Sequence, residues 1–160
     1  MRPLFNNILL AITGTDASIS AAKYGIIMAK QYRCRLSAVY VIDTATIRQL
    51  YLSRIFIKEE SLEYEESLEA TGERYLSFTE ELAWAKGIRL DREMRRGAVY
   101  TEILNAAEEK KADLILLGGW ERDRNVRELI SHAYREVMTN AKCSVLLVKE
   151  PAIDQLYKQA

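Results

Sequence analysis

The stretch LILLGGWERDRNVRELISHAYREV, residues 114–137, joins an apolar run, a polar loop and a helical pattern. The apolar run predicts a buried strand. A helix is predicted after the loop, because apolar side chains recur there at the spacing of one helix face: Val126, Ile130, Ala133 and Val137. Many α/β proteins bind phosphate where such a strand passes into a helix, because the helix N-terminus offers free backbone amides. The question is whether this loop is such a site.

The rest of the chain repeats the same alternation. Short, nearly continuous apolar runs are typical of strands buried on both faces of a parallel sheet, and they occupy residues 8–12, 36–42, 114–117 and 145–148. Helical spacing separates them. We therefore predict an α/β fold, a doubly wound sheet with right-handed crossovers and helices on both faces.

A fifth strand is predicted at residues 88–94. Ile88, Leu90 and Met94 alternate there with charged residues, as in a strand with one wet face. We expect this strand at an edge of the sheet.

Residues 44–86 contain no strand pattern. A long helix, preceded by an irregular or helical arm, is predicted from one apolar stripe: Tyr64, Leu68, Thr71, Tyr75, Phe78 and Leu82. Gly72 predicts a bend within it, because glycine weakens a helix. Glutamates crowd the start of this helix, which indicates a solvated face or, as the alternative, an acidic docking surface.

Composition limits the class of protein. The 160 residues fit one domain, which we place at residues 1–150 with a tail or short terminal helix at 151–160. The 23 basic and 23 acidic side chains balance, which argues against nucleic-acid or membrane binding. Cys34 and Cys143 form no CxxC pair, so we expect reduced core thiols, no disulfide framework and no structural zinc. The early apolar run is too short for a signal peptide, so a soluble, cytoplasmic protein is expected.

The last strand predicts self-association. The segment CSVLLVKE, residues 143–150, is apolar at nearly every position, yet a strand at the end of a five-stranded open sheet often lies at its edge. An unprotected edge pairs readily with another chain. We expect a homodimer through residues 143–149.

The order and spacing of five motifs resemble the universal stress protein family. They are ILLAITGTDAS from residue 8, AVYVID from 38, RGAVYTEIL from 96, ADLILLGG from 112, and CSVLLVKE. The resemblance implies five strands in the order 3-2-1-4-5, four helices, an adenine nucleotide alpha hydrolase-like fold and dimerisation through strand five.

One branch of that family binds ATP through the pattern G-x-x-G, nine residues, G-S/T, with an aspartate at the end of strand one. Here Gly118 matches the first glycine, but Glu121 takes the second place, and two like charges about 4 Å apart repel by about 4 kcal/mol at an effective dielectric constant of 20. Ser131 and His132 stand for the last pair, and Thr13 replaces the aspartate. The sequence thus resembles the branch without the ATP motif.

Other features of the site admit two interpretations. Val41 and Gly97 match positions where relatives meet the nucleotide, and both also have a reason in the fold. We interpret Asp16 as the cap of the helix after strand one. In the opening loop, Asn125 and Glu128 form a capping-box pattern.

Charge and aromatic residues complete that loop. Its arginines, at 122, 124 and 127, are balanced by acids, so the loop does not concentrate positive charge, although one arginine reaching a phosphate is the alternative. Trp120 is expected in core or dimer packing, with stacking on a ligand base as the alternative.

No catalytic signature is present. The single histidine, His132, has no nucleophile motif beside it and is expected at a surface or facing a partner. Asp16 and Asp43 lie near strand ends, but nothing fixes them as an acid–base pair. We expect no metal and no enzymatic turnover.

Three functions remain open. The first is a non-catalytic stress-response protein that acts through dimerisation and protein contacts, with no cofactor. The second is a sensor or slow ATPase that binds ATP or AMP through Val41, Gly97 and Gly118. The third is a small-ligand carrier that uses the cleft between strands one and four.

Overall fold

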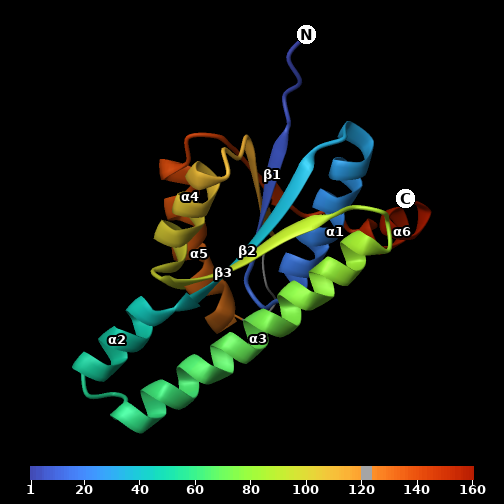
Figure 1. Cartoon of the computed structure of the whole chain (residues 1–160). Coiled ribbons are helices and arrows are strands. Elements are labelled where there is room, and N and C mark those ends of the chain that lie inside the picture. Colours follow the sequence, from blue (N-terminus) through green and yellow to red (C-terminus); the bar gives the residue numbers. More distant parts are fainter. Residues whose placement is uncertain (120–123) are drawn as a thin grey trace.

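The computed structural model of the protein is an alternation of strands and helices along the chain (Figure 1). The structure describes residues 1–119 and 124–160, without the side chains of residues 124–131. The strands are β1 (Asn7–Ile12), β2 (Arg35–Asp43), β3 (Leu90–Gly97), β4 (Leu114–Gly118) and β5 (Ser144–Val148). The helices are α1 (Asp16–Tyr32), α2 (Thr44–Leu52), α3 (Lys58–Trp84), α4 (Val99–Glu109), α5 (Arg124–Asn140) and α6 (Ile153–Gln159).

The five strands form one parallel sheet in the order β3-β2-β1-β4-β5, which confirms the predicted fold. Two helices of the described chain, α2 and α6, are additional to the four expected. Figure 1 shows α4 and α5 on one face of the sheet, and α1 and α3 on the other.

The continuous apolar runs supply both faces of the sheet. Along β1, Ile8, Leu10 and Ile12 join the core beneath α1 and α3, whereas Leu9 and Ala11 join the core beneath α4 and α5. All five are at most 3% exposed. A strand buried on both sides shows no polar alternation, which is why its sequence reads as an unbroken apolar run.

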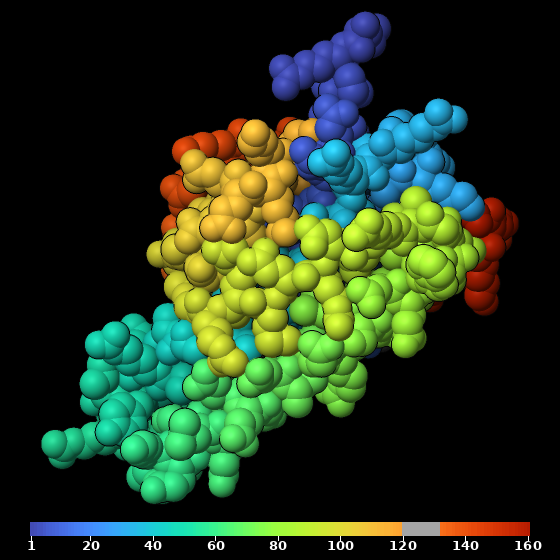
Figure 2. Space-filling view, viewed as in Figure 1, coloured from blue at the N-terminus to red at the C-terminus, as the bar shows by residue number. Residues whose placement is uncertain are grey.

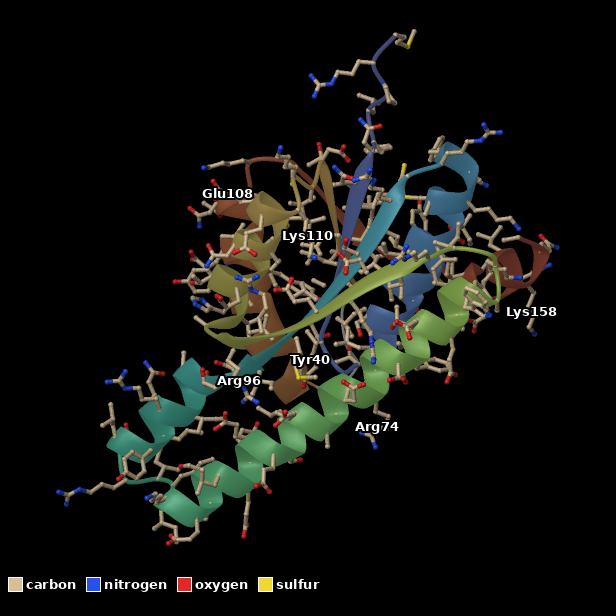
Figure 3. All side chains as sticks on the ribbon, in the orientation of Figure 1. Tyr40, Arg74, Arg96, Glu108, Lys110 and Lys158 are labelled. Atoms are coloured by element: carbon tan, nitrogen blue, oxygen red, sulfur yellow. The ribbon has the colours of Figure 1, made fainter. Side chains whose placement is uncertain are left out.

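The edge position predicted for the third strand is confirmed, but the strand runs over Leu90–Gly97 rather than 88–94. Two of its arginines pair with glutamates of α3: Arg92 Nη1 lies 3.0 Å from Glu73 Oε1, and Arg96 pairs with Glu65 and, at 3.2 Å, with Glu69. Figure 3 places Arg96 between the sheet and α3. Part of the glutamate cluster therefore neutralises an edge strand of the same chain.

The segment between β2 and β3 is helical throughout most of its length, as α2 and α3. The long helix α3 lies across the sheet with its buried residues Gly72, Leu76, Thr79 and Ala83 on one stripe. Gly72 has a packing role that the sequence did not reveal: a Cβ atom there would lie 2.4 Å from Cδ1 of Tyr40. The glycine allows α3 to approach the Tyr40 ring.

The C-terminal residues form α6, one of the two alternatives considered. Ile153 is buried, Lys23 Nζ of α1 lies 2.7 Å from Asp154 Oδ1, and the Tyr157 hydroxyl donates a 2.7 Å hydrogen bond to the Leu82 carbonyl. The helix thus contacts both α1 and α3. Within the described ranges, none of the helices is long and apolar enough to cross a membrane.

Gly72→Ala should lower the free energy of unfolding by about 1–2 kcal/mol, because overpacking against Tyr40 exceeds the gain in helix propensity. Urea denaturation monitored by circular dichroism measures this change. In a Tyr40→Val background the ring is absent, and the same glycine substitution should be neutral or stabilising. Equal destabilisation in both backgrounds would contradict the packing role.

Candidate functional site

The candidate site lies where the parallel strands end, at the carboxyl end of the sheet. In the strand register Ile12 lies beside Tyr40 and Asp43 beside Gly97, so the ends of β1, β2 and β3 meet there. Gly118 ends β4, which is the other neighbour of β1. Doubly wound folds bind ligands at this end, between the strands at which the order reverses. The structure therefore brings Thr13, Val41, Gly97 and Gly118 to one end of the sheet.

Thr13, which stands at the position of the family aspartate, belongs to a hydroxyl network. Its Oγ1 lies 2.9 Å from Oγ1 of Thr15, which in turn accepts a 3.2 Å hydrogen bond from the Ser18 amide. The Ser18 hydroxyl donates to the Thr15 carbonyl at 2.8 Å. This network ties the end of β1 to the first turn of α1.

The same network corrects the expected helix cap. Thr15, not Asp16, is the N-cap of α1 and forms a capping box with Ser18. Asp16 is the first helical residue and is exposed. A negative charge at this position interacts favourably with the positive end of the helix dipole. Proximity to the strand end alone does not distinguish these two neighbouring cap candidates.

Gly118 lies against the main chain of α1. A Cβ atom at this position would lie 2.5 Å from the Ala17 carbonyl carbon and 2.8 Å from the Ser18 amide nitrogen. Both contacts are with backbone, which cannot rotate away. The fold itself therefore requires glycine at the first position of the nucleotide pattern.

Gly97 also has a backbone reason. Its φ angle is +144°, a value that side chains with a Cβ rarely adopt, and a Cβ would lie 3.0 Å from Cγ of Glu102. It is the last residue of β3, one residue before the N-cap of α4. Glycine here serves the turn from β3 into α4.

Val41 is 9% exposed and packs in the core beneath α4 and α5. The ladder between β1 and β2 ends at Tyr40, whereas Val41 is still paired with Arg95 of β3. Beyond Tyr40, therefore, β2 no longer pairs with β1. This geometry agrees with both interpretations of Val41, a core residue and a main-chain contact for a ligand.

Tyr40 is a residue of this region that the sequence did not single out. Its ring carbon Cε2 would lie 3.7 Å from a Cβ on Gly14, and its other edge faces Gly72. Figure 3 labels Tyr40 between the sheet and α3. Burial raises the pKa of the Tyr40 phenol, and nearby Tyr64 and Tyr75 raise it further. Gly14 and Gly72 were the available sequence signal for this contact, because a glycine often marks a position where another group packs closely against the backbone.

Arg95, at the β3 side of these strand ends, forms ion pairs with several glutamates. The Arg95 guanidinium contacts Glu93 and Glu109 at 2.7 and 2.8 Å and Glu102 at 3.5 Å. The hydrogen bond to Glu109 is the main cause that raises the pKa of Arg95 above its usual value. Arg95 lies on β3, at the edge of the sheet, whereas Gly118 lies on β4, three strands away. The charge of Arg95 therefore neutralises carboxylates at the β3 edge and is remote from Gly118.

The two candidate carboxylates do not form a described pair. Asp43 caps α2, accepting hydrogen bonds from the Thr46 amide at 3.0 Å and the Thr46 hydroxyl at 2.7 Å. Asp16 is exposed at the start of α1. In the described part of the chain, no group of three or more His, Cys, Asp or Glu side chains is placed to hold a metal ion.

His132 and the cysteines occupy ordinary packing positions. His132 is exposed, and its ring meets Tyr100 edge to face at 6.1 Å. Cys34 and Cys143 are half-buried rather than fully in the core. Burial, and then the charge of Asp113, raises the pKa of both thiols, which disfavours the reactive thiolate.

Most of the opening loop lies outside the described part of the chain. Trp120, Glu121 and Arg122 are not among the described residues. Nor are the side chains of Arg124, Asn125, Arg127, Glu128 and Ser131, so their predicted roles stay predictions.

Comparison with known proteins places this geometry in a family. The model of the universal stress protein family matches residues 4–149. Universal stress protein MJ0531 of Methanocaldococcus jannaschii is 34% identical over 149 residues, which cover 92% of this chain and 84% of that protein.

Solved structures share the fold. The universal stress protein UspA from Lactobacillus plantarum superposes with a TM-score of 0.73 at 19% identity, covering 92% of this chain and 100% of that one. A universal stress protein in complex with cAMP gives a TM-score of 0.66 at 17% identity, covering 92% and 99%. From the family match and the identity to MJ0531 together, this chain belongs to the universal stress protein family.

Proposed function

We propose that this universal stress protein acts in the stress response through dimerisation and protein contacts, without turning over a nucleotide. The observation that carries the proposal is the packing of Gly118 on the main chain of α1, where an added Cβ atom would lie 2.5 Å from the Ala17 carbonyl carbon. The glycine that matches the ATP pattern has a reason independent of any ligand. Apart from this glycine, the chain departs from the ATP pattern at every position considered.

Those departures concern charge and shape. Thr13 supplies a hydroxyl, already bonded to Thr15, where ATP-binding relatives are expected to supply a carboxylate. Glu121 places a negative charge at the second glycine position of the pattern, and Ser131 and His132 alter the last two. Phosphate oxygens and a carboxylate repel each other at short range, so these changes disfavour a triphosphate.

Dimerisation is proposed through β5. This strand is at an open edge of the sheet, and Val145, Leu146 and Leu147 are only partly buried within one chain. The opposite edge, β3, carries charged residues that discourage pairing with another strand. The contrast between the two edges favours β5 as the dimer surface.

A nucleotide-binding sensor is the second candidate, because the cAMP complex of a family member has the same fold. Val41 would offer its main chain, and Gly97 and Gly118 would lie beside the nucleotide. ATP or AMP in an acid extract of freshly purified protein would favour this candidate. A small-ligand carrier using the same end of the sheet would instead release another compound in that extract.

Addition of millimolar ATP and magnesium should leave the melting temperature unchanged, because under the proposed function the protein has no specific nucleotide site. Differential scanning fluorimetry measures this. A ligand present at 100 times its Kd stabilises the folded state by about 2.7 kcal/mol, so a clear upward shift would support the sensor instead.

Gly118→Ala should destabilise the nucleotide-free protein by about 2–3 kcal/mol, because the methyl group meets the backbone of α1. Gly87→Ala is the matched control: it has a φ of +73° but open space around its Cβ, and should cost about 1 kcal/mol. Urea unfolding compares the two. If Gly118→Ala proved no more harmful than the control, a ligand would be the better reason for this glycine.

Sedimentation equilibrium should show association at micromolar protein concentration, as expected for pairing through β5. Replacing Leu147 with lysine adds charge to a partly buried position of that strand and should shift the mass toward the monomer. The equivalent change at exposed Met138 of α5 is the control and should leave the mass unaltered. A wild-type protein that remains monomeric would remove the dimer.

A further inference from the structure

The helical arm, defined as residues 44–66, carries a cluster of exposed apolar side chains. Figure 1 shows α2 and the first turns of α3 extending beyond the layers of the fold, and Figure 2 shows the same part protruding from the surface. Six large apolar residues of the arm are 43% to 66% exposed: Tyr51, Leu52, Ile55, Ile57, Leu62 and Tyr64. Apolar side chains gathered in this way on a protruding element mark an interaction surface.

The arm is a formed structure, not an extended segment. Asp43 caps α2, Ile47 is buried, and the rings of Phe56 and Tyr64 pack edge to face at 5.6 Å. Arg54 adopts the left-handed conformation at the turn, with a φ of +59°. The exposed apolar groups are therefore presented by a helical hairpin with its own internal contacts.

Charges of both signs surround these apolar groups. Arg48 lies on α2, Arg54 and Lys58 lie on either side of the turn between α2 and α3, and Glu59, Glu63 and Glu66 share one face of α3 with Leu62, at spacings of three and four residues. None of these six charged residues forms an ion pair among the described residues. Neighbouring Glu65 and Glu69 differ, because Arg96 of the same chain neutralises them.

We propose that the arm docks against the arm of a second copy of this chain, with the two α2–α3 hairpins related by a two-fold axis. A two-fold interface uses one patch twice, so the patch must complement itself. Arg54 and Lys58 of one arm would face Glu63 and Glu66 of the other, with Leu52, Ile55 and Leu62 enclosed between the two arms. A surface carrying both signs beside apolar groups fits this requirement.

Other occupants fit the charges less well. An anionic membrane would attract Arg54 and Lys58 but would be repelled by the glutamates one turn away. A partner of a single charge sign would leave one of the two charged groups unmatched.

This interface goes beyond the proposed β5 dimer and does not compete with it. The arm follows β2 and precedes β3, whereas β5 is at the opposite edge of the sheet. Both contacts can form in the same molecule, and together they would build an assembly larger than a dimer.

Charge exchange tests the two-fold docking. One variant carries Arg54→Glu and Lys58→Glu, the other Glu63→Lys and Glu66→Lys. Each alone should raise the Kd of arm-mediated association about tenfold or more, because like charges then face each other. An equimolar mixture should restore wild-type association in sedimentation velocity, because opposite charges meet again at both contacts. Failure of the mixture to associate better than either variant alone would overturn the proposal.

The apolar contribution has a control outside the arm, at the other end of α3. Leu52→Ser with Ile55→Ser should weaken the association about tenfold or more, whereas Trp84→Ser, 78% exposed at the other end of α3, should not change it. Circular dichroism confirms that each variant is folded. Equal association of wild type and the Leu52 and Ile55 variant would overturn the proposal. So would wild-type binding to anionic vesicles with no arm-dependent self-association.

The two interfaces give different results. If arm variants sediment as dimers and wild type as a larger species, both interfaces exist. If arm variants are monomers and wild type is a dimer, the arm proposal holds and the β5 dimer fails.

Discussion

Close contact between the end of β4 and the first turn of α1 is the constraint on which the structure depends. No side chain fits between Gly118 and the backbone of Ala17 and Ser18, so the strand and the helix meet main chain to main chain. The strand order reverses between β1 and β4, which are neighbours in the sheet. Since α1 follows β1, the contact lies at this point of the fold. The hydroxyl network of Thr13, Thr15 and Ser18 connects the end of β1 to the same turn of α1. The glycine that matches the first position of the nucleotide pattern thus also has a structural role.

The two edges of the sheet are managed differently, and this difference shapes the proposed assemblies. Along β3, arginines point alternately toward α3 and α4, where Arg92 and Arg96 meet glutamates of α3 and Arg95 meets those of α4. Such a charged edge resists pairing with another strand. The sequence of β5, SVLLV, carries no charge, so strand pairing is proposed there. The arm beside β3 then offers a helical surface for a second type of contact.

The sequence was sufficient for the fold because the buried strands are apolar on both faces. The sequence was less informative where charged residues form ion pairs within the chain. Residues 88–94 were predicted as the edge strand, but Arg95 and Arg96 extend it to Gly97, and their pairing with glutamates cannot be seen from alternation alone. The sequence predicts a bend at Gly72 but does not reveal its packing against Tyr40, more than thirty residues away. The cap of α1 was misplaced by one residue, because Thr15 and Asp16 both suit an N-cap.

The candidate site was predictable in position and only partly in role. Family motifs brought Thr13, Val41, Gly97 and Gly118 to the carboxyl end of the sheet, where the structure also places them. Whether a glycine serves packing or a ligand depends on the atoms around it, which a sequence does not give.

A titration of isotope-labelled protein with ATP and magnesium, followed through backbone amide resonances, measures directly whether the carboxyl end of the sheet binds nucleotide. We predict that the amides of Thr13, Val41, Gly97 and Gly118 keep their chemical shifts up to millimolar nucleotide. Saturable shifts concentrated at these four residues would contradict it, because the carboxyl end of the sheet would then hold the nucleotide.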